Sequence, residues 1–143
     1  MLDGETLYPL ELVLHGTPVG LQSKNAARRE AWREQVKEAA RARQRETYDL
    51  GFLDDRAVAV TIYYFPIAPM EGDLDNIVKL ILDGMIGVAY LDDHVVERVT
   101  VQKFEPEAGW EFSAVTDQLA AALDAEAPVV YIRVDDDPTW RRL

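Results

Sequence analysis

Residues 72–83 read GDLDNIVKLILD. The apolar residues of this stretch recur at helical spacing, whereas Asp75, Lys79 and Asp83 stand four apart on a different stripe. This pattern predicts a helix that begins at Asp73, packs one face against a core and leaves the other face open to water or to a substrate.

The same stretch combines carboxylates with one cation. Asp73 and Asp75 precede Lys79, and Asp92 and Asp93 follow further along the chain. A hard divalent cation such as Mg²⁺ takes oxygen ligands from one or two carboxylates, water and substrate phosphate. The residue types therefore suit a metal-dependent phosphodiesterase.

A purely structural interpretation of the same residues exists. Aspartate is common at helix N-caps, so Asp73 could cap the helix while Asp75 favours its first turn and Lys79 forms an ion pair with Asp75. Asp83 is expected to be an ion-pair partner rather than a metal ligand.

The stretch resembles the signature of the RusA family of Holliday junction resolvases. That signature is an Asp-Leu-Asp-Asn start to a helix, a lysine one turn on, and a later Leu-Asp-Asp before a strand. It is matched here by 73–76, Lys79 and 91–93, and the resemblance extends roughly from Leu10 to Phe104. The resemblance implies a small homodimeric, Mg²⁺-dependent endonuclease that nicks four-way DNA junctions symmetrically.

Carried over by position, the resemblance assigns the catalytic residues Asp73, Asp75, Lys79 and Asp93. It assigns Asp73, Asp75 and Asp93 to the metal, with Asp92 as an additional ligand. The metal is expected to be Mg²⁺, or Mn²⁺ in its place, and no organic cofactor is expected. We expect Lys79 to stabilise charge in the transition state rather than to act as a base.

One feature departs from the family pattern. The family has arginines just before its first catalytic aspartate, where residues 66–72 here read PIAPMEG. That loop brings no positive charge to DNA.

Composition predicts one domain over residues 1–143, with 135–143 as a flexible tail. The chain has 143 residues, 48% of them hydrophobic, and no cysteine, which excludes thiolate catalysis and cysteine-bound metals. No apolar run is long enough to span a membrane, and residues 1–5 lack the features of a secretory signal. We therefore expect a cytoplasmic protein that does not enter membranes.

Charge is distributed unevenly along the chain. The net charge is −11, but residues 24–45 hold eight basic and three acidic side chains, so this segment carries +5 and the remainder −16. Such asymmetry is typical of a protein that presents one face to a polyanion; the alternative is a solvated helix laced with ion pairs. The DNA-binding residues predicted on this basis are Lys24, Arg28, Arg29, Arg33 and Lys37.

The remaining pattern predicts an α+β fold. Strands are expected near 10–14, 57–65, 95–104 and 129–134, and further helices near 25–45 and 116–123. We expect a mixed sheet of about four or five strands, with the basic helix and the helix from Asp73 packed mainly on one face. The aromatic residues within these elements, Trp32, Tyr63, Tyr64 and Phe65, are expected to fill the core rather than stack on bases.

Three functions are compatible with these observations. The first is a structure-selective endonuclease that acts on branched DNA, as a homodimer, in recombination and repair. The second is a catalytically silent module of the same fold that binds junctions or another partner. The third is a different Asp-x-Asp phosphohydrolase. Residues 69–72 argue against it, because they separate the first aspartate from the preceding strand.

Overall fold

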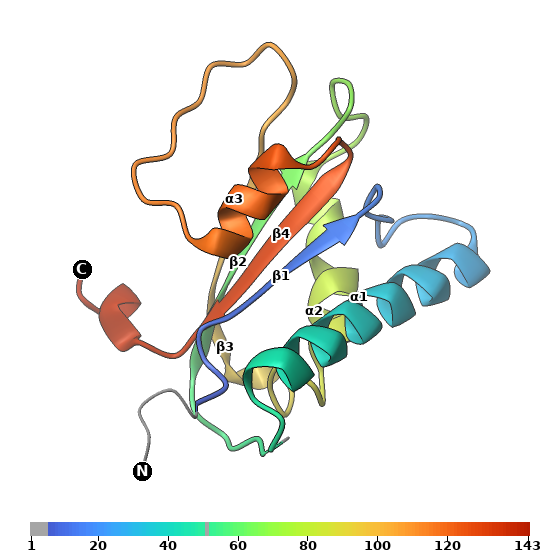
Figure 1. The fold of residues 1–143 in the computed structure, drawn as a ribbon. Coiled ribbons are helices and arrows are strands. Elements are labelled where there is room, and N and C mark those ends of the chain that lie inside the picture. The colour runs from blue at the N-terminus through green and yellow to red at the C-terminus, as the bar shows by residue number, and fades with distance from the viewer. Residues whose placement is uncertain (1–5, 51) are drawn as a thin grey trace.

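A computed structural model describes residues 6–50 and 52–143. Residues 1–5, in which the sequence predicts no secretory signal, lie outside this range. The described chain forms a mixed four-stranded sheet with helices on both faces (Figure 1). None of its helices combines the length and apolar character needed to cross a bilayer.

The sheet has the strand order β1-β4-β2-β3. β1 (Leu10–His15) pairs antiparallel with β4 (Val129–Asp135), which pairs antiparallel with β2 (Val58–Phe65). β2 pairs in parallel with β3 (Val96–Lys103). Because parallel neighbours need a crossover, the chain between β2 and β3 passes through the helix that carries Lys79.

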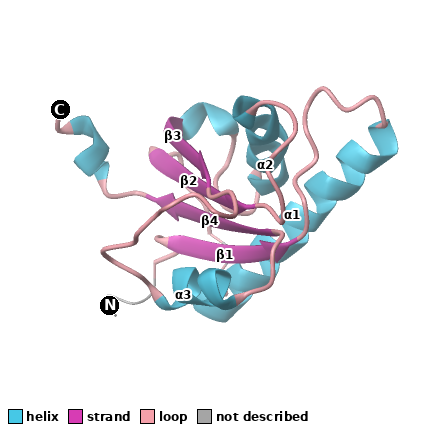
Figure 2. Cartoon of the chain, turned by 90° about the horizontal axis from the view of Figure 1, so that it is seen from above, coloured by secondary structure: helices cyan, strands magenta, loops and turns pink. Residues whose placement is uncertain are grey.

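One face of the sheet is covered by α1 (Ala26–Thr47) and α2 (Val78–Met85), as Figure 2 shows from above. Alternate strand residues point to this face and are buried. On α1 the buried residues are Trp32, Val36 and Ala40. The helices expected on one face do lie together there.

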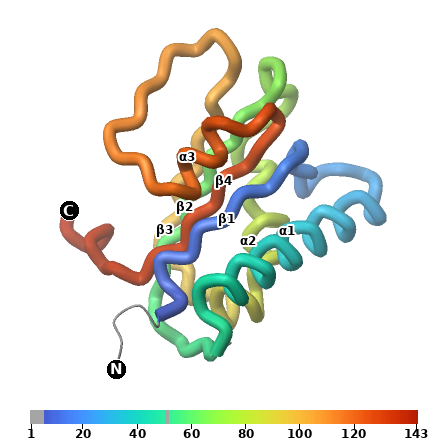
Figure 3. The backbone as a smooth tube through the Cα atoms, in the orientation of Figure 1, coloured from blue at the N-terminus to red at the C-terminus, as the bar shows by residue number. Residues whose placement is uncertain are grey.

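The opposite face carries α3 (Asp117–Asp124) and an aromatic cluster. Phe65 and Phe104 stack at a centroid distance of 4.8 Å, and Tyr63 meets Phe104 edge-on at 5.2 Å. A long loop between β3 and α3, visible as the projecting orange tube in Figure 3, adds the half-buried Phe112. The strand aromatics therefore belong to the core, as expected.

Short 3-10 helices complete the chain. η1 (Leu74–Ile77) leads directly into α2, so the single helix expected from Asp73 is two segments of different winding. η2 (Asp93–Val95) precedes β3. η3 (Pro138–Arg141) lies in the segment predicted as a flexible tail, of which Asp135 is the last residue of β4.

Candidate active site

The loop of residues 66–72 delivers the chain to Asp73. Its prolines stop the strand, and Gly72 adopts φ of 85°, a left-handed conformation that favours glycine. Asp73 then takes the N-cap position of η1, but its side chain makes no capping hydrogen bond. The cap interpretation of Asp73 is therefore not realised, and its exposed carboxylate is left available.

Asp75 lies two residues further, in the first turn of the 3-10 helix η1. Its side chain is exposed, and it forms no ion pair with any residue of the described chain. The proposed pair between Asp75 and Lys79 is wrong. The spacing of four was counted on a continuous α-helix, whereas the residues from Leu74 to Ile77 wind as a 3-10 helix, in which side chains four apart do not align.

Lys79 instead lies between two other carboxylates. Its Nζ is 2.9 Å from Asp93 Oδ2 and 2.9 Å from Asp83 Oδ1. The hydrogen bond to Asp93, followed by that to Asp83, raises the pKa of Lys79 to about 12. Lys79 is thus a cation at neutral pH and remains about half exposed. The ion-pair role expected for Asp83 is confirmed.

Asp92 and His94 form a separate exposed pair. Asp92 accepts the backbone N–H of Asp93 at 2.9 Å, and its other oxygen lies 3.1 Å from His94 Nδ1. The contact with His94, together with the backbone hydrogen bond, holds the pKa of Asp92 below its usual value. Asp92 therefore serves as the cap of η2, which orients Asp93 toward Lys79.

These aspartates do not gather into one cluster. Within residues 6–50 and 52–143, no three His, Asp or Glu side chains lie close enough together to hold a metal ion. The structure brings Lys79, Asp83 and Asp93 together along α2 and leaves Asp73 and Asp75 in the segment before it.

The basic residues predicted to bind DNA all lie on α1 or just before it. Several cations of this helix are already paired at a spacing of three, including Arg33 with Glu30 at 2.6 Å and Arg41 with Glu38 at 2.5 Å. The ion-pair alternative thus holds for part of the helix.

Other cations of this segment keep their charge unneutralised. Lys24 and Arg28 have no ion-pair partner in the described chain, and Arg29 donates to the Ser23 carbonyl oxygen. Lys37 Nζ lies 3.4 Å from the Ile86 carbonyl oxygen at the end of α2. This contact places Lys37 at the end of the helix that carries Lys79.

Two residues near the site were not singled out by sequence. Asn76 Oδ1 accepts the backbone N–H of Gln22 at 3.0 Å, and its carbonyl oxygen accepts that of Leu21 at 2.9 Å. Glu105 accepts the backbone N–H of Met70 at 2.7 Å. Asn76 could have been found, since it stands inside the Asp-Leu-Asp-Asn motif; no local signal marks Glu105.

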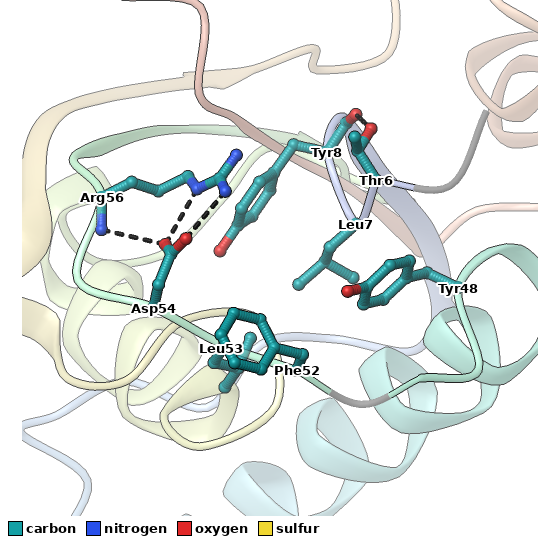
Figure 4. A pocket seen from close by; sticks show the side chains of 8 residues that line it. All are labelled: Thr6, Leu7, Tyr8, Tyr48, Phe52, Leu53, Asp54 and Arg56. Atoms are coloured by element: carbon teal, nitrogen blue, oxygen red, sulfur yellow. Dashed lines mark hydrogen bonds and ion pairs between the residues drawn. The ribbon is translucent and has the colours of Figure 1, made fainter. Parts of the chain in front are cut away.

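A cavity of about 270 Å³ lies away from these residues, beside the segments that precede β1 and β2 (Figure 4). It is bordered by Tyr8, Phe52 and Arg56, which precede β1 and β2. Arg56 bonds Asp54 at 2.7 Å and Asp136 at 2.8 Å. Among the described residues that line this cavity, the two charged side chains, Arg56 and Asp54, are therefore paired with each other.

The described chain is thus an α+β domain that carries Lys79 between Asp83 and Asp93 on its surface, with Asp73 and Asp75 exposed in the segment before α2. The family model described as endodeoxyribonuclease RusA matches residues 19–110, which is more than half of the chain. The chain belongs to the RusA family of endodeoxyribonucleases. Among curated proteins, none matches the chain.

Proposed function

We propose that this chain is a Mg²⁺-dependent endodeoxyribonuclease that cuts four-way DNA junctions. One observation supports the proposal: the chain carries the RusA-type motif, in which Asp73 and Asp75 are exposed just before α2 and Lys79 on α2 pairs with Asp93. Unlike Lys79, Asp73 and Asp75 are not engaged in ion pairs with the described residues, so they are free to bind a cation or a substrate group.

The donor chemistry fits Mg²⁺. Carboxylate oxygens are the ligands this cation prefers, and we assign them to Asp73, Asp75 and Asp93, with Asp92 as a further donor. No three acidic side chains of the described residues lie close enough together to hold the cation, so its binding would have to draw these carboxylates together. When bound, the cation would supply a deprotonated water at neutral pH and would neutralise charge on the phosphate. Mn²⁺ accepts the same ligands and is expected to substitute.

Lys79 has a role that does not require proton transfer. With a pKa of about 12, it cannot serve as a general base near neutral pH. Its ammonium group can donate to a nonbridging or leaving oxygen as negative charge develops there. Asp93 and Asp83 hold the Lys79 ammonium group at the surface of α2 in the absence of DNA.

We assign most of the affinity for DNA to α1 and the residues just before it. Lys24, Arg28, Arg29, Arg33 and Lys37 are the cations we assign to phosphate contacts, because cations on phosphates supply most of the affinity for duplex DNA. We further propose a homodimer, since two symmetric nicks need two sites related by a two-fold axis. Analytical ultracentrifugation would report a monomer if this part is incorrect.

The test compares a labelled four-way junction with a linear duplex of the same sequence, in Mg²⁺ and in EDTA at low salt. We expect cleavage of the junction alone, and only with the metal. Asp73→Asn and Asp75→Asn should lose cleavage by about 100-fold or more, because each removes a metal ligand, while binding of the junction persists. Full cleavage by both variants would refute the assignment.

A catalytically silent junction-binding module is the second candidate. It is favoured by the lack of any cation in residues 66–72 and by the separation of Asp73 and Asp75 from the Lys79 row. A wild-type protein that binds junctions but cuts none in Mg²⁺ or Mn²⁺ would establish this function instead.

A further inference from the structure

A cavity of about 420 Å³ adjoins Asp73. One wall is the loop of residues 66–71, the other is the segment from Thr17 to Gly20, and η1 closes the side between them with Asp73 and Asn76. The cavity has the size of a small-ligand site and lies directly beside a proposed metal ligand.

The walls of this cavity are held in place by hydrogen bonds. Met70 donates its backbone N–H to Glu105 at 2.7 Å, which ties the loop of residues 66–71 to the end of β3. Asn76 holds the opposite wall by accepting from Leu21 and Gln22. Gly20 permits this approach, since a Cβ there would lie 2.0 Å from Asn76 Nδ2. The cavity is therefore formed before any ligand arrives.

The lining excludes an anion and favours a neutral group with apolar faces. It contains no lysine or arginine, and it carries two carboxylates, Glu71 and Asp73, which would repel a phosphate. Its lining is mixed, and the apolar part comes from both walls, from side chains such as Pro18, Ile67 and Met70. Within a DNA strand, the uncharged and apolar-faced component is the base.

We infer that this cavity receives the base of a nucleotide adjoining the phosphate that is cut. The inference rests on the proposed function, because it is Asp73 that would place a metal-bound phosphate at the mouth of the cavity. Near the crossover of a four-way junction, a base leaves the stack at a lower energetic cost than within an intact duplex. Cleavage would then depend on that base, so the loop of residues 66–71 reads sequence where a basic loop would grip phosphate.

The test combines a protein variant whose new side chain fills the cavity with DNA substrates that lack the base. Ala68→Trp puts a large side chain on the exposed part of the lining, and Ala121→Trp on the surface of α3 is the matched control. Each protein is assayed on intact junctions and on junctions with an abasic residue on either side of the cut. We expect one abasic position to slow the wild type and Ala121→Trp by about 10-fold.

Ala68→Trp should be slow on the intact junction to a similar degree and should lose nothing more on the abasic one. If the rate loss caused by Ala68→Trp and the rate loss caused by the abasic residue multiply when the two are combined, the side chain and the base act independently. That result would overturn the inference. Should Ala68→Trp fail to fold, Ile67→Ala is the second variant. Ile67 is 71% exposed, so its truncation leaves the core intact while removing one side of the cavity.

A binding assay separates this inference from the nuclease proposal. 2-Aminopurine placed beside the crossover should change in fluorescence when the wild type binds in EDTA, and should not change with Ala68→Trp. A wild type that cuts junctions equally well with or without the flanking bases would overturn the inference and leave the nuclease intact. A wild type that never cuts would refute the nuclease proposal. The 2-aminopurine fluorescence would then test base binding by the cavity, and no change on binding would overturn the inference.

Discussion

Lys79 lies between two carboxylates that come from different elements. Asp83 is on the same helix, one turn on, whereas Asp93 arrives from the start of η2. Helical spacing alone would allow Lys79 to pair with either Asp75 or Asp83. Asp75 does not pair with Lys79, because its segment is wound as a 3-10 helix. Helical spacing therefore indicated the two candidate partners on this stretch but not which of them pairs with Lys79.

Replacing the two partners of Lys79 one at a time tests whether Asp93, and not Asp83, binds the metal. Asp83→Asn removes only a partly exposed ion pair of the type worth up to about 1 kcal/mol, so we expect the cleavage rate to change by no more than about fivefold. Asp93→Asn should reduce it by about 100-fold or more if Asp93 holds the metal. Single-turnover rates on a labelled junction measure both, and equal losses would contradict the assignment of Asp93.

At the scale of elements, some helices could be predicted and one could not. Asn25 accepts the Arg28 N–H and Thr116 accepts the Leu119 N–H, so both helix starts follow from local capping. The break at Val78 does not follow from local pattern. Asn76 is held by backbone groups of residues 21 and 22, and such long-range bonds leave no periodic trace in sequence.

Gly84 sets the distance between α1 and α2. A Cβ at this position would lie 2.8 Å from Val36 Cβ and 2.9 Å from the Arg33 carbonyl oxygen. Gly84→Ala should therefore destabilise the protein by roughly 1–3 kcal/mol, despite the better helix propensity of alanine. Gly109→Ala, where a Cβ meets nothing within 4 Å, is the control and should change stability by less than about 0.5 kcal/mol. Urea unfolding curves that coincide for both variants would show that the contact is not tight.

The tail at η3 docks on the edge strand through one carboxylate. Glu97 of β3 accepts hydrogen bonds from Trp140 Nε1 at 2.9 Å and from Arg141 at 2.6 and 2.7 Å. The hydrogen bonds from Arg141, then from Trp140, lower the pKa of Glu97 to about 2. The partner Glu97 could not be foreseen from the sequence, because 43 residues separate it from Trp140.

Acid should release the tail. The pKa of Glu97 is lower in the folded state than its ordinary value of 4.5, so docking is fully favourable above that value and weakens as the pH falls toward 2. The indole N–H resonance of Trp140 should therefore shift in this range, ahead of that of the buried Trp32. In Glu97→Gln the Trp140 resonance should not titrate; an unchanged titration in that variant would exclude Glu97 as the cause.

For the whole molecule, the net charge is −11 although residues 24–45 are basic, and we expect this basic segment to determine where DNA binds. The sequence gives the number of cations on α1 but not which are already paired. Arg41 bonds Glu38, whereas Arg28 has no ion-pair partner in the described chain. Only the latter kind can release counterions from DNA without first losing a protein partner.

Salt dependence distinguishes these two kinds of cation. For Arg28→Gln, we expect the slope of log affinity against log salt concentration to fall in magnitude by about 0.9, the value for one phosphate contact. Arg41→Gln should change the slope less, because Glu38 already neutralises that side chain. Fluorescence anisotropy with a labelled junction at several salt concentrations provides the slopes. Identical slopes for wild type and Arg28→Gln would remove Arg28 from the interface.

The place of β4 in the sheet has a consequence for how the protein is made. Within residues 6–50 and 52–143, β4 is the last strand, yet it lies between β1 and β2 and is the only strand that pairs with β1. During synthesis on the ribosome, β1 and the core face beneath it therefore have no neighbouring strand until residues 129–135 emerge. The domain must complete its fold after translation has passed this point, and a nascent chain stalled before Val129 would offer its apolar face to chaperones.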